Sequence, residues 1–247
     1  MVRLRFWAIV VVALVGLTGG PAAGFDDKPH TGFIDMVYKN ASGYEAKYVV
    51  FIPHKYDSKE ALPVILFLHG SGAVGNDGRK QIAGALAKAI RKDEKDFAFI
   101  AVFPQSHEGG WTAGSADGKR ALAILDEVVS TYKADKQRTY LTGLSMGGEG
   151  TWSLAAARPE RWSAIVPLCG GGDIKIAAKI KDIPCWCFHG DADKMIPAAE
   201  SRKMIRALWQ AGGRPLYHEF PDVGHDCWDR VYAMPGVYEW LLLQKLK

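Results

Sequence analysis

The stretch TYLTGLSMGGEGTW, residues 139–152, combines a short apolar run, a turn crowded with glycine around Ser145, and the start of a helix. A sharp turn from a strand into a helix brings backbones close together and strains the apex residue, which explains the glycines at 143 and 147. The order G-L-S-M-G fits the G-x-S-x-G pattern, in which a serine hydroxyl stands exposed at the end of a strand. We therefore predict Ser145 as a nucleophile. The alternative is a glycine-rich helix N-terminus that binds an anion such as phosphate.

Apolar strands and amphipathic helices alternate on both sides of this stretch. The run PVILFLHG, residues 63–70, is nearly continuous in apolar residues, as expected of a strand in a parallel sheet that is covered on both faces. Further strands are predicted at 46–52, 97–103, 139–142, 164–168, 185–188 and 216–220, and helices at 81–91, 119–132, 147–157, 198–211 and 237–246. This alternation predicts an α/β fold with a mostly parallel, doubly wound sheet and helices on both faces. Only about fifteen residues separate the end of one predicted strand at Cys169 from the start of the next at Cys185. This connection is too short to contain a large lid domain.

The first 24 residues differ in composition from the rest of the chain. Arg3 and Arg5 precede an apolar run at 6–17, and small, turn-prone residues follow at 20–24. This layout is typical of a secretory signal peptide, with cleavage predicted near residues 22–24. An uncleaved membrane anchor is the alternative, but a membrane span needs about 20 apolar residues. We expect an exported protein, periplasmic or extracellular, whose mature domain covers residues 25–247.

Charge and cysteine content narrow the possible partners. The formal charge of the 247-residue chain is +4, and it is +2 without residues 1–24. Because Lys and Arg are spread along the chain, neither a nucleic acid nor a membrane surface is indicated as a partner. The spacing of the four cysteines, Cys169, Cys185, Cys187 and Cys227, matches no zinc-binding pattern. We therefore expect buried cysteines and not a metal site. One disulfide is compatible with this expectation, but its pairing is not assigned. We predict no metal and no cofactor, and the oligomeric state stays open.

A nucleophilic serine needs a base within hydrogen-bond reach and a carboxylate that orients the base. His225, in FPDVGHDCW, follows the last predicted strand in a loop from which it can reach over the sheet edge, and we predict it as the base. Asp193, in CWCFHGDADKMIP, is the predicted acid; Asp191 is its rival, with turn or cap chemistry as its other role. The chain order Ser145, Asp193, His225 is the order of an α/β-hydrolase triad.

Acyl transfer also requires donors for the oxyanion that forms during attack. The backbone N–H of Met146, directly after the nucleophile, is one predicted donor. The second is assigned to the N–H of Ser71 in LHGSGAVG, with Gly72 as the alternative. His69 is interpreted as a structural residue that ties this loop in place.

Five motifs in order, LHGSG, FPQ, YLTGLSMGGEGTWSLAAARPERWSAIVPLCGGGD, HGDAD and GHDCW, carry a family resemblance. The chain resembles the secreted, lidless α/β-hydrolases grouped as phospholipase/carboxylesterase, dienelactone-hydrolase-like or prolyl-oligopeptidase-like proteins, to which feruloyl esterases and polyhydroxybutyrate depolymerases are related. The resemblance covers nearly all of the chain after residue 24 and implies an α/β-hydrolase catalytic domain over residues 25–247. Two departures stand out. Ala73 and Val74 replace a Glu-Arg pair that members often carry, and Glu149 replaces an aromatic residue.

The resemblance implies a serine esterase that hydrolyses carboxylic esters through an acyl-enzyme. Its substrate would be a small-molecule or polysaccharide-linked ester, and acetyl or feruloyl esters of polysaccharides are favoured by export and an open site. Trp111 and Trp228, on loops expected near the carboxyl edge of the sheet, are candidate stacking residues; ordinary partly buried tryptophans are the alternative. Two other functions stay open: a serine peptidase of the prolyl-oligopeptidase type, and a non-catalytic carbohydrate-binding protein on the same scaffold.

Overall fold

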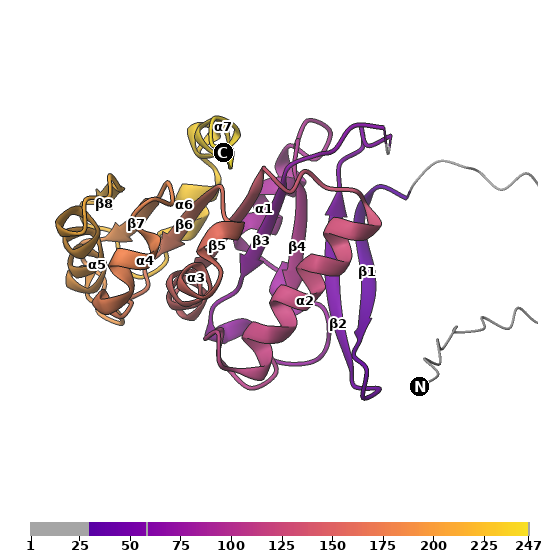
Figure 1. The fold of residues 1–247 in the computed structure, drawn as a ribbon, viewed down its shortest axis with the longest axis horizontal. Coiled ribbons are helices and arrows are strands. Elements are labelled where there is room, and N and C mark those ends of the chain that lie inside the picture. The colour runs from indigo at the N-terminus through magenta and orange to yellow at the C-terminus, as the bar shows by residue number, and fades with distance from the viewer. Residues whose placement is uncertain (1–29, 58, 247) are drawn as a thin grey trace, which may run out of the picture.

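One eight-stranded sheet forms the centre of the molecule. The computed structural model describes residues 30–57 and 59–246, so the predicted signal peptide lies outside the described residues. The strands follow the order β1-β2-β4-β3-β5-β6-β7-β8, with β1 at one end and β8 at the other (Figure 1). β1 and β2 are antiparallel to their neighbours, and the remaining pairs are parallel. The strands are β1 (Gly32–Lys39), β2 (Glu45–Ile52), β3 (Val64–Leu68), β4 (Ile100–Pro104), β5 (Thr139–Leu144), β6 (Ala164–Leu168), β7 (Trp186–Gly190) and β8 (Leu216–Phe220).

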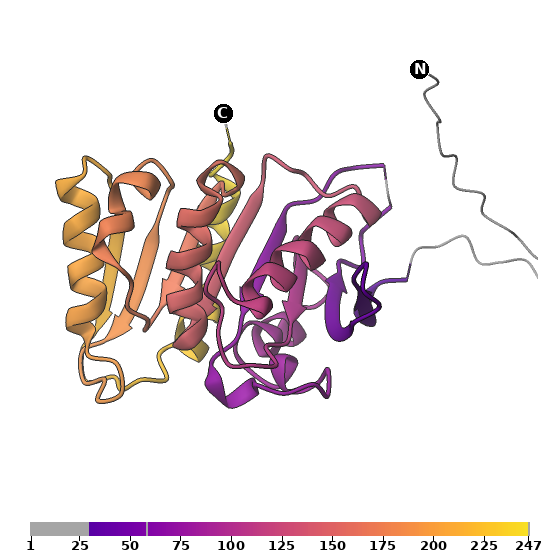
Figure 2. The same ribbon diagram turned by 60° about the horizontal axis from the view of Figure 1, so that its bottom comes forward.

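Helices cover both faces of this sheet (Figures 1 and 2). One core lies between the sheet and α2 (Ala116–Thr131), α3 (Met146–Ala157), α4 (Ala177–Ile180) and α5 (Ala198–Gln210). The other lies beneath α1 (Ala85–Lys92), α6 (Trp228–Tyr232) and α7 (Pro235–Leu242). The central strands β3 to β6 are buried along their whole length because each strand carries apolar residues on both faces. The predicted doubly wound α/β architecture is confirmed.

Several elements differ from the sequence prediction, which did not contain the short helices α4 and α6. β1 was not predicted, because its side chains alternate between half-buried and exposed and it pairs only with β2 at the sheet edge. The helix predicted at 81–91 is divided into a short 3-10 helix, η2 (Lys80–Ile82), and α1. The division falls at Gly84, which has an extended backbone, and Ala85, whose φ of 48° lies in the left-handed region. This break lies beside the candidate site described below.

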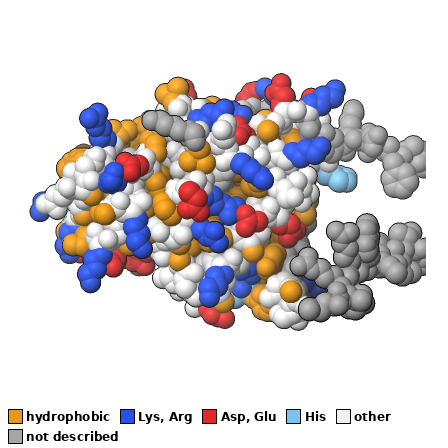
Figure 3. Space-filling view, viewed as in Figure 1, with side chains coloured by type: hydrophobic (Ala, Val, Ile, Leu, Met, Phe, Trp, Pro, Cys, Tyr) orange, Lys and Arg blue, Asp and Glu red, His pale blue; other side chains and the backbone are white. Residues whose placement is uncertain are grey.

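The carboxyl ends of the parallel strands meet at one edge of the sheet, where ligands bind in folds of this type. Between β6 and β7 the chain forms only a 3-10 helix, η4 (Ile174–Ile176), and α4, so this connection holds no lid domain. No helix in the described part of the chain is sufficiently long and apolar to cross a membrane. Figure 3 shows acidic and basic side chains interspersed over the visible face, without a large area of one sign.

Candidate active site

Ser145 occupies a strained turn between β5 and α3. Its φ of 54° and ψ of −121° lie outside the regions that L-residues ordinarily adopt. The turn requires glycine on both sides: a Cβ at Gly143 would lie 2.3 Å from the carbonyl oxygen of Gly147, and one at Gly147 would lie 1.9 Å from that of Leu68. The Ser145 N–H donates to the Leu168 carbonyl at 3.0 Å, which fixes the turn against β6. The hydroxyl therefore stands at the carboxyl edge of the sheet, as the sequence predicts.

Three side chains from separate loops meet at this turn. The Nε2 atom of His225 lies 2.9 Å from the Ser145 hydroxyl oxygen, and its Nδ1 atom lies 2.6 Å from Oδ2 of Asp193. Asp193 has a fully buried side chain and follows β7, and His225, which follows β8, is 12% exposed. With the ring proton on Nδ1 donated to Asp193, Nε2 is free to accept the serine proton. This geometry is that of a nucleophile, a base and an orienting carboxylate.

The Asp193 carboxylate is held by more than His225. Its Oδ1 atom accepts hydrogen bonds from the N–H groups of Met195 (2.8 Å) and Ile196 (3.0 Å). Burial raises the pKa of Asp193, but the hydrogen bonds from His225, Ile196 and Met195 outweigh it and keep the pKa below its ordinary value. The carboxylate therefore stays ionised beside the imidazole. The rival Asp191 instead accepts a hydrogen bond from the Asp222 N–H at 2.7 Å, which is a turn role.

His189 is a site residue that sequence reasoning missed. It is fully buried at the end of β7, and its Nε2 lies 3.1 Å from Oδ2 of Asp193 and 2.8 Å from the Ile196 carbonyl oxygen. Since both neighbours of Nε2 are acceptors, Nε2 carries a proton, and Nδ1 pairs with the Ser201 hydroxyl at 2.7 Å. His189 thus anchors the acid loop to α5. Its position in HGDAD, directly ahead of the acid, was the available signal.

The predicted oxyanion donors lie on two segments next to Ser145. Ser71 begins a 3-10 helix, η1 (Ser71–Ala73), and Met146 begins α3; neither backbone amide donates to an acceptor within residues 30–57 and 59–246. The two segments approach closely, because a Cβ at Gly70 would lie 2.8 Å from Cδ1 of Leu144 and 3.5 Å from Cβ of Ser145. The arrangement is compatible with the predicted pair, and the oxyanion role of these amides stays a prediction.

His69 holds the loop that carries Ser71. The Ser106 N–H donates to Nε2 of His69 at 2.9 Å, so the neutral ring carries its proton on Nδ1, which donates to the Gly70 carbonyl at 2.7 Å. Burial lowers the pKa of His69, which keeps the ring neutral and preserves this pattern. The structure agrees with the interpretation of His69 as a structural residue.

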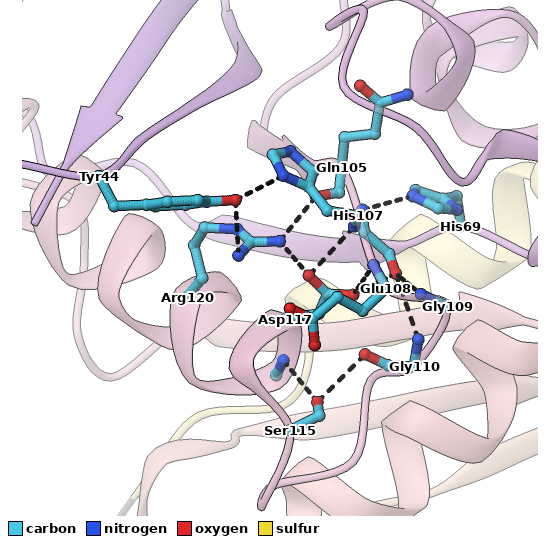
Figure 4. A network of polar contacts seen from close by, with 12 residues as sticks. Tyr44, His69, Gln105, His107, Glu108, Gly109, Gly110, Ser115, Asp117 and Arg120 are labelled. Atoms are coloured by element: carbon cyan, nitrogen blue, oxygen red, sulfur yellow. Dashed lines mark hydrogen bonds and ion pairs between the residues drawn. The ribbon is translucent and has the colours of Figure 1, made fainter.

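A buried network of polar groups around Asp117 contacts His69 through Ser106 (Figure 4). Asp117, which is fully buried in the first turn of α2, accepts hydrogen bonds from the Ser106 hydroxyl (2.5 Å), the N–H groups of His107 (3.1 Å) and Glu108 (2.9 Å), and the guanidinium of Arg120. Burial raises the pKa of Asp117, but these donors outweigh it, so the net shift is downward. The network fixes the end of β4, and with it the residue that anchors the Ser71 loop.

The two predicted stacking tryptophans have different positions. Trp111 is only 1% exposed, and its indole N–H donates to the His69 carbonyl at 2.9 Å, so it is a core residue that cannot stack on a substrate. The prediction for Trp111 is therefore wrong. Trp228 is half-buried beside His225, with ring centroids 5.5 Å apart, and both residues line an open cavity of about 320 Å³ at Ser145. The substrate contact of Trp228 stays a prediction.

All four cysteines are buried free thiols. Cys185 and Cys187 lie on the same side of the sheet, in the core that α2, α3, α4 and α5 cover, as their spacing predicts. Burial raises the pKa of Cys187 to about 12, and contact with Cys227 together with burial raises that of Cys169. The cysteines therefore behave as small core side chains.

The chain is similar to several known proteins. The family described as BD-FAE matches residues 50–160. A probable feruloyl esterase C of Aspergillus terreus is 26% identical over 181 residues, which are 71% of this chain and 64% of that protein. A bifunctional acetylxylan esterase/xylanase of Neocallimastix patriciarum is also 26% identical, over 64% of this chain and 23% of that protein. The chain thus spans less than two thirds of either relative.

Solved structures are similar in fold. The crystal structure of a thermostable esterase superimposes with a TM-score of 0.80 and 29% identity, over 86% of this chain and 63% of that one. A CE1 ferulic acid esterase of Anaeromyces mucronatus has a TM-score of 0.65 at 16% identity, over 89% of this chain and 93% of that one, and shows the fold alone. The chain has the α/β-hydrolase fold, and the relatives and the two structures to which it is similar are described as esterases.

Proposed function

We propose that this protein is a serine esterase in which Ser145, His225 and Asp193 form the catalytic triad. The observation that carries the proposal is the continuous hydrogen-bonded chain from the Ser145 hydroxyl through both ring nitrogens of His225 to Asp193. In the first step, the serine oxygen forms a bond to the ester carbonyl carbon while Nε2 of His225 takes the serine proton. The N–H groups of Ser71 and Met146 donate to the oxyanion.

The intermediate collapses when the bond to the leaving oxygen breaks. His225 returns its proton to that oxygen, the alcohol leaves, and an acyl-Ser145 ester remains. Water then attacks the acyl carbon while His225 takes a proton from it. The bond between the acyl carbon and the Ser145 oxygen breaks, His225 returns the proton to that oxygen, and the carboxylic acid is released. Asp193 holds the ring in the required tautomer and stabilises its charged form, a task for which its lowered pKa suits it.

The substrate class and the location of the protein belong to the same proposal. The relatives named as feruloyl and acetylxylan esterases favour acetyl or feruloyl esters attached to polysaccharides. The absence of a lid domain between β6 and β7 leaves the site open to a bulky alcohol. A similar protein of Arthroderma benhamiae is described as secreted, and the signal-like layout of residues 1–24 supports export of this chain.

The test is hydrolysis of p-nitrophenyl acetate, butyrate and octanoate by the mature chain and by Ser145→Ala, together with labelling by a serine-directed phosphonate. We expect turnover of the short esters by the wild type, a loss of about 10³-fold or more in the variant, and phosphonate on Ser145 alone. An inactive wild type whose Ser145 is not labelled would contradict the proposal. Binding of polysaccharide by such a protein would instead favour the non-catalytic alternative.

A further inference from the structure

The cavity at Ser145 has one wall that the catalytic chemistry does not use. His225 and Trp228 form one side, and the Ser71 loop lies next to the nucleophile. The remaining wall comes from η2 and the first residues of α1, where Gln81 and Ala85 line the cavity. At about 320 Å³ the cavity is at the small end of the ligand-pocket range, about 300–1,000 Å³, so it suits one ring-sized group and not a polymer chain.

Gln81 is the unusual residue of this wall. Its side chain is buried, with 2% of the residue exposed, yet neither the amide nitrogen nor the amide oxygen has a hydrogen-bond partner in the described chain. Gln105, which is equally buried, provides the contrast. Its oxygen accepts from the Gly78 N–H at 2.7 Å, and its nitrogen donates to the Ala73 carbonyl at 3.0 Å. Because buried amides are almost always paired, a partner from outside the chain is expected at Gln81.

The surroundings of Gln81 indicate the kind of group that would pair with it. Phe67, Leu144 and Ala85 give the cavity apolar walls, and Lys80 is the lining residue with a permanent charge. Ala85 keeps a φ of 48°, and such strain persists where the surrounding structure enforces it and clusters at binding sites. An apolar body with polar substituents at its far end fits these walls. The lining offers no carboxylate that would attract a cation.

The direction of the reaction places the acyl group in this cavity. The leaving oxygen must face Nε2 of His225 to receive its proton, and the carbonyl oxygen must face the amides of Ser71 and Met146. The acyl substituent takes the remaining direction from the carbon bonded to Ser145, away from these groups. Gln81 lines the cavity into which that substituent extends.

We propose that Gln81 is a specificity-determining residue whose amide binds oxygen substituents on the ring of an aromatic acyl group. This inference rests on the proposed esterase function. The amide offers one acceptor and one N–H₂ donor side by side, so it can accept from a ring hydroxyl and donate to the oxygen of a neighbouring methoxy group. A ring without oxygen substituents would leave the buried amide unpaired, and sites built in this way discriminate against such analogues. The favoured substrates are therefore esters of hydroxylated, methoxylated arylpropenoic acids.

The experiment compares kcat/KM for methyl ferulate and methyl cinnamate, which differ only in the ring hydroxyl and methoxy groups. We expect the wild type to favour the ferulate by about tenfold or more. In Gln81→Leu, which keeps an apolar shape without the amide, this ratio should fall toward one. The control Gln210→Leu alters an exposed glutamine at the end of α5 and should keep the wild-type ratio.

The unfolding midpoint of Gln81→Leu separates a binding role from a structural one. Removing an unpaired amide should leave the midpoint unchanged or raise it. A lower midpoint with an unchanged ratio would mean that Gln81 serves the fold, and the inference would be wrong. If the variant does not fold, the wild-type ratio decides alone, because a ratio near one contradicts the inference.

Hydrolysis of p-nitrophenyl acetate keeps the two proposals distinguishable. Turnover of the acetate that depends on Ser145, combined with no preference between the two methyl esters, would overturn the role of Gln81 and leave the esterase proposal standing. Failure to hydrolyse any of the three esters would overturn both.

Discussion

Replacement of Asp117 by asparagine tests whether the buried network behind the candidate site is essential to the fold. Each carboxylate oxygen accepts two donors: Oδ1 faces the His107 N–H and Arg120, and Oδ2 faces the Ser106 hydroxyl and the Glu108 N–H. In Asp117→Asn, the new N–H₂ group must point at one of these pairs. Two hydrogen bonds are lost in either orientation, and Arg120, 7% exposed, loses the only carboxylate that it contacts within the described chain.

The expected loss follows from that geometry. Breaking a buried ion pair by removal of one partner costs about 3–5 kcal/mol, because the other charge stays buried. For a domain of this size, 1 kcal/mol corresponds to about 2–4 °C, so the midpoint of thermal unfolding should fall by roughly 6–20 °C. Urea unfolding, followed by far-UV circular dichroism with the slope m held in common, gives the free energy directly.

Two further variants make this prediction refutable. Asp35→Asn removes a carboxylate that binds Arg79 at the surface, where both side chains are more than half exposed, and should cost less than about 1 kcal/mol. Arg120→Met added to Asp117→Asn should recover part of the loss, because it removes the stranded charge. If Asp117→Asn unfolds within about 1 kcal/mol of the wild type, as Asp35→Asn should, the network does not carry the stability assigned to it.

Three other outcomes are expected. Asp193→Asn should lower kcat for p-nitrophenyl acetate by about 10⁴, whereas Asp191→Asn, which alters only a turn, should lower it by less than about tenfold; equal losses would contradict the assignment of the acid. Gly147→Ala should yield no folded protein because its Cβ would lie 1.9 Å from a carbonyl oxygen, whereas Gly236→Ala, with open space around it, should fold and unfold like the wild type in circular dichroism. Because the pKa of Asp117 is lower in the folded than in the unfolded protein, its ionised carboxylate stabilises the fold. This contribution is fully present above the unfolded-state pKa, about 3.9, and is lost as the pH falls toward the lower folded value. The urea midpoint should accordingly drop below about pH 4, and drop less in Asp117→Asn; parallel pH profiles would refute this.

The meeting of Ser145, Asp193 and His225 in the candidate site could be predicted from the sequence because each residue carries a local signal. The glycines around Ser145 mark a turn that no other residue permits, and the loops after two strands contain the aspartate and the histidine in the required order. The apolar runs of β3 and β5 likewise determine a sheet buried on both faces. In each case a few neighbouring residues contain the physical constraint.

The remaining features depend on contacts between distant segments. Trp111 is buried because Gly150 on α3 leaves space for it: a Cβ at Gly150 would lie 2.3 Å from that of Trp111. Nothing in the sequence near Trp111 indicates this contact. Helical spacing placed Gln81 inside a continuous helix, whereas it lies in the separate η2 and lines the cavity. The alternating pattern of β1 was too weakly apolar to be distinguished from a loop.

The buried residues that hold the loops of the candidate site and the exposed residues at its rim have different roles. On one side of Ser145 the Asp117 network holds His69 and the Ser71 loop, and on the other His189 holds the Asp193 loop against α5. Both anchors are remote from solvent, so they fix reacting groups to the accuracy that acyl transfer requires. The rim of the cavity is different, since Met195 is 73% exposed and lines the same cavity. A site that is rigid at the acyl carbon and open beyond it can select the acid part of an ester closely while it accepts alcohols of almost any size, including one attached to a polymer.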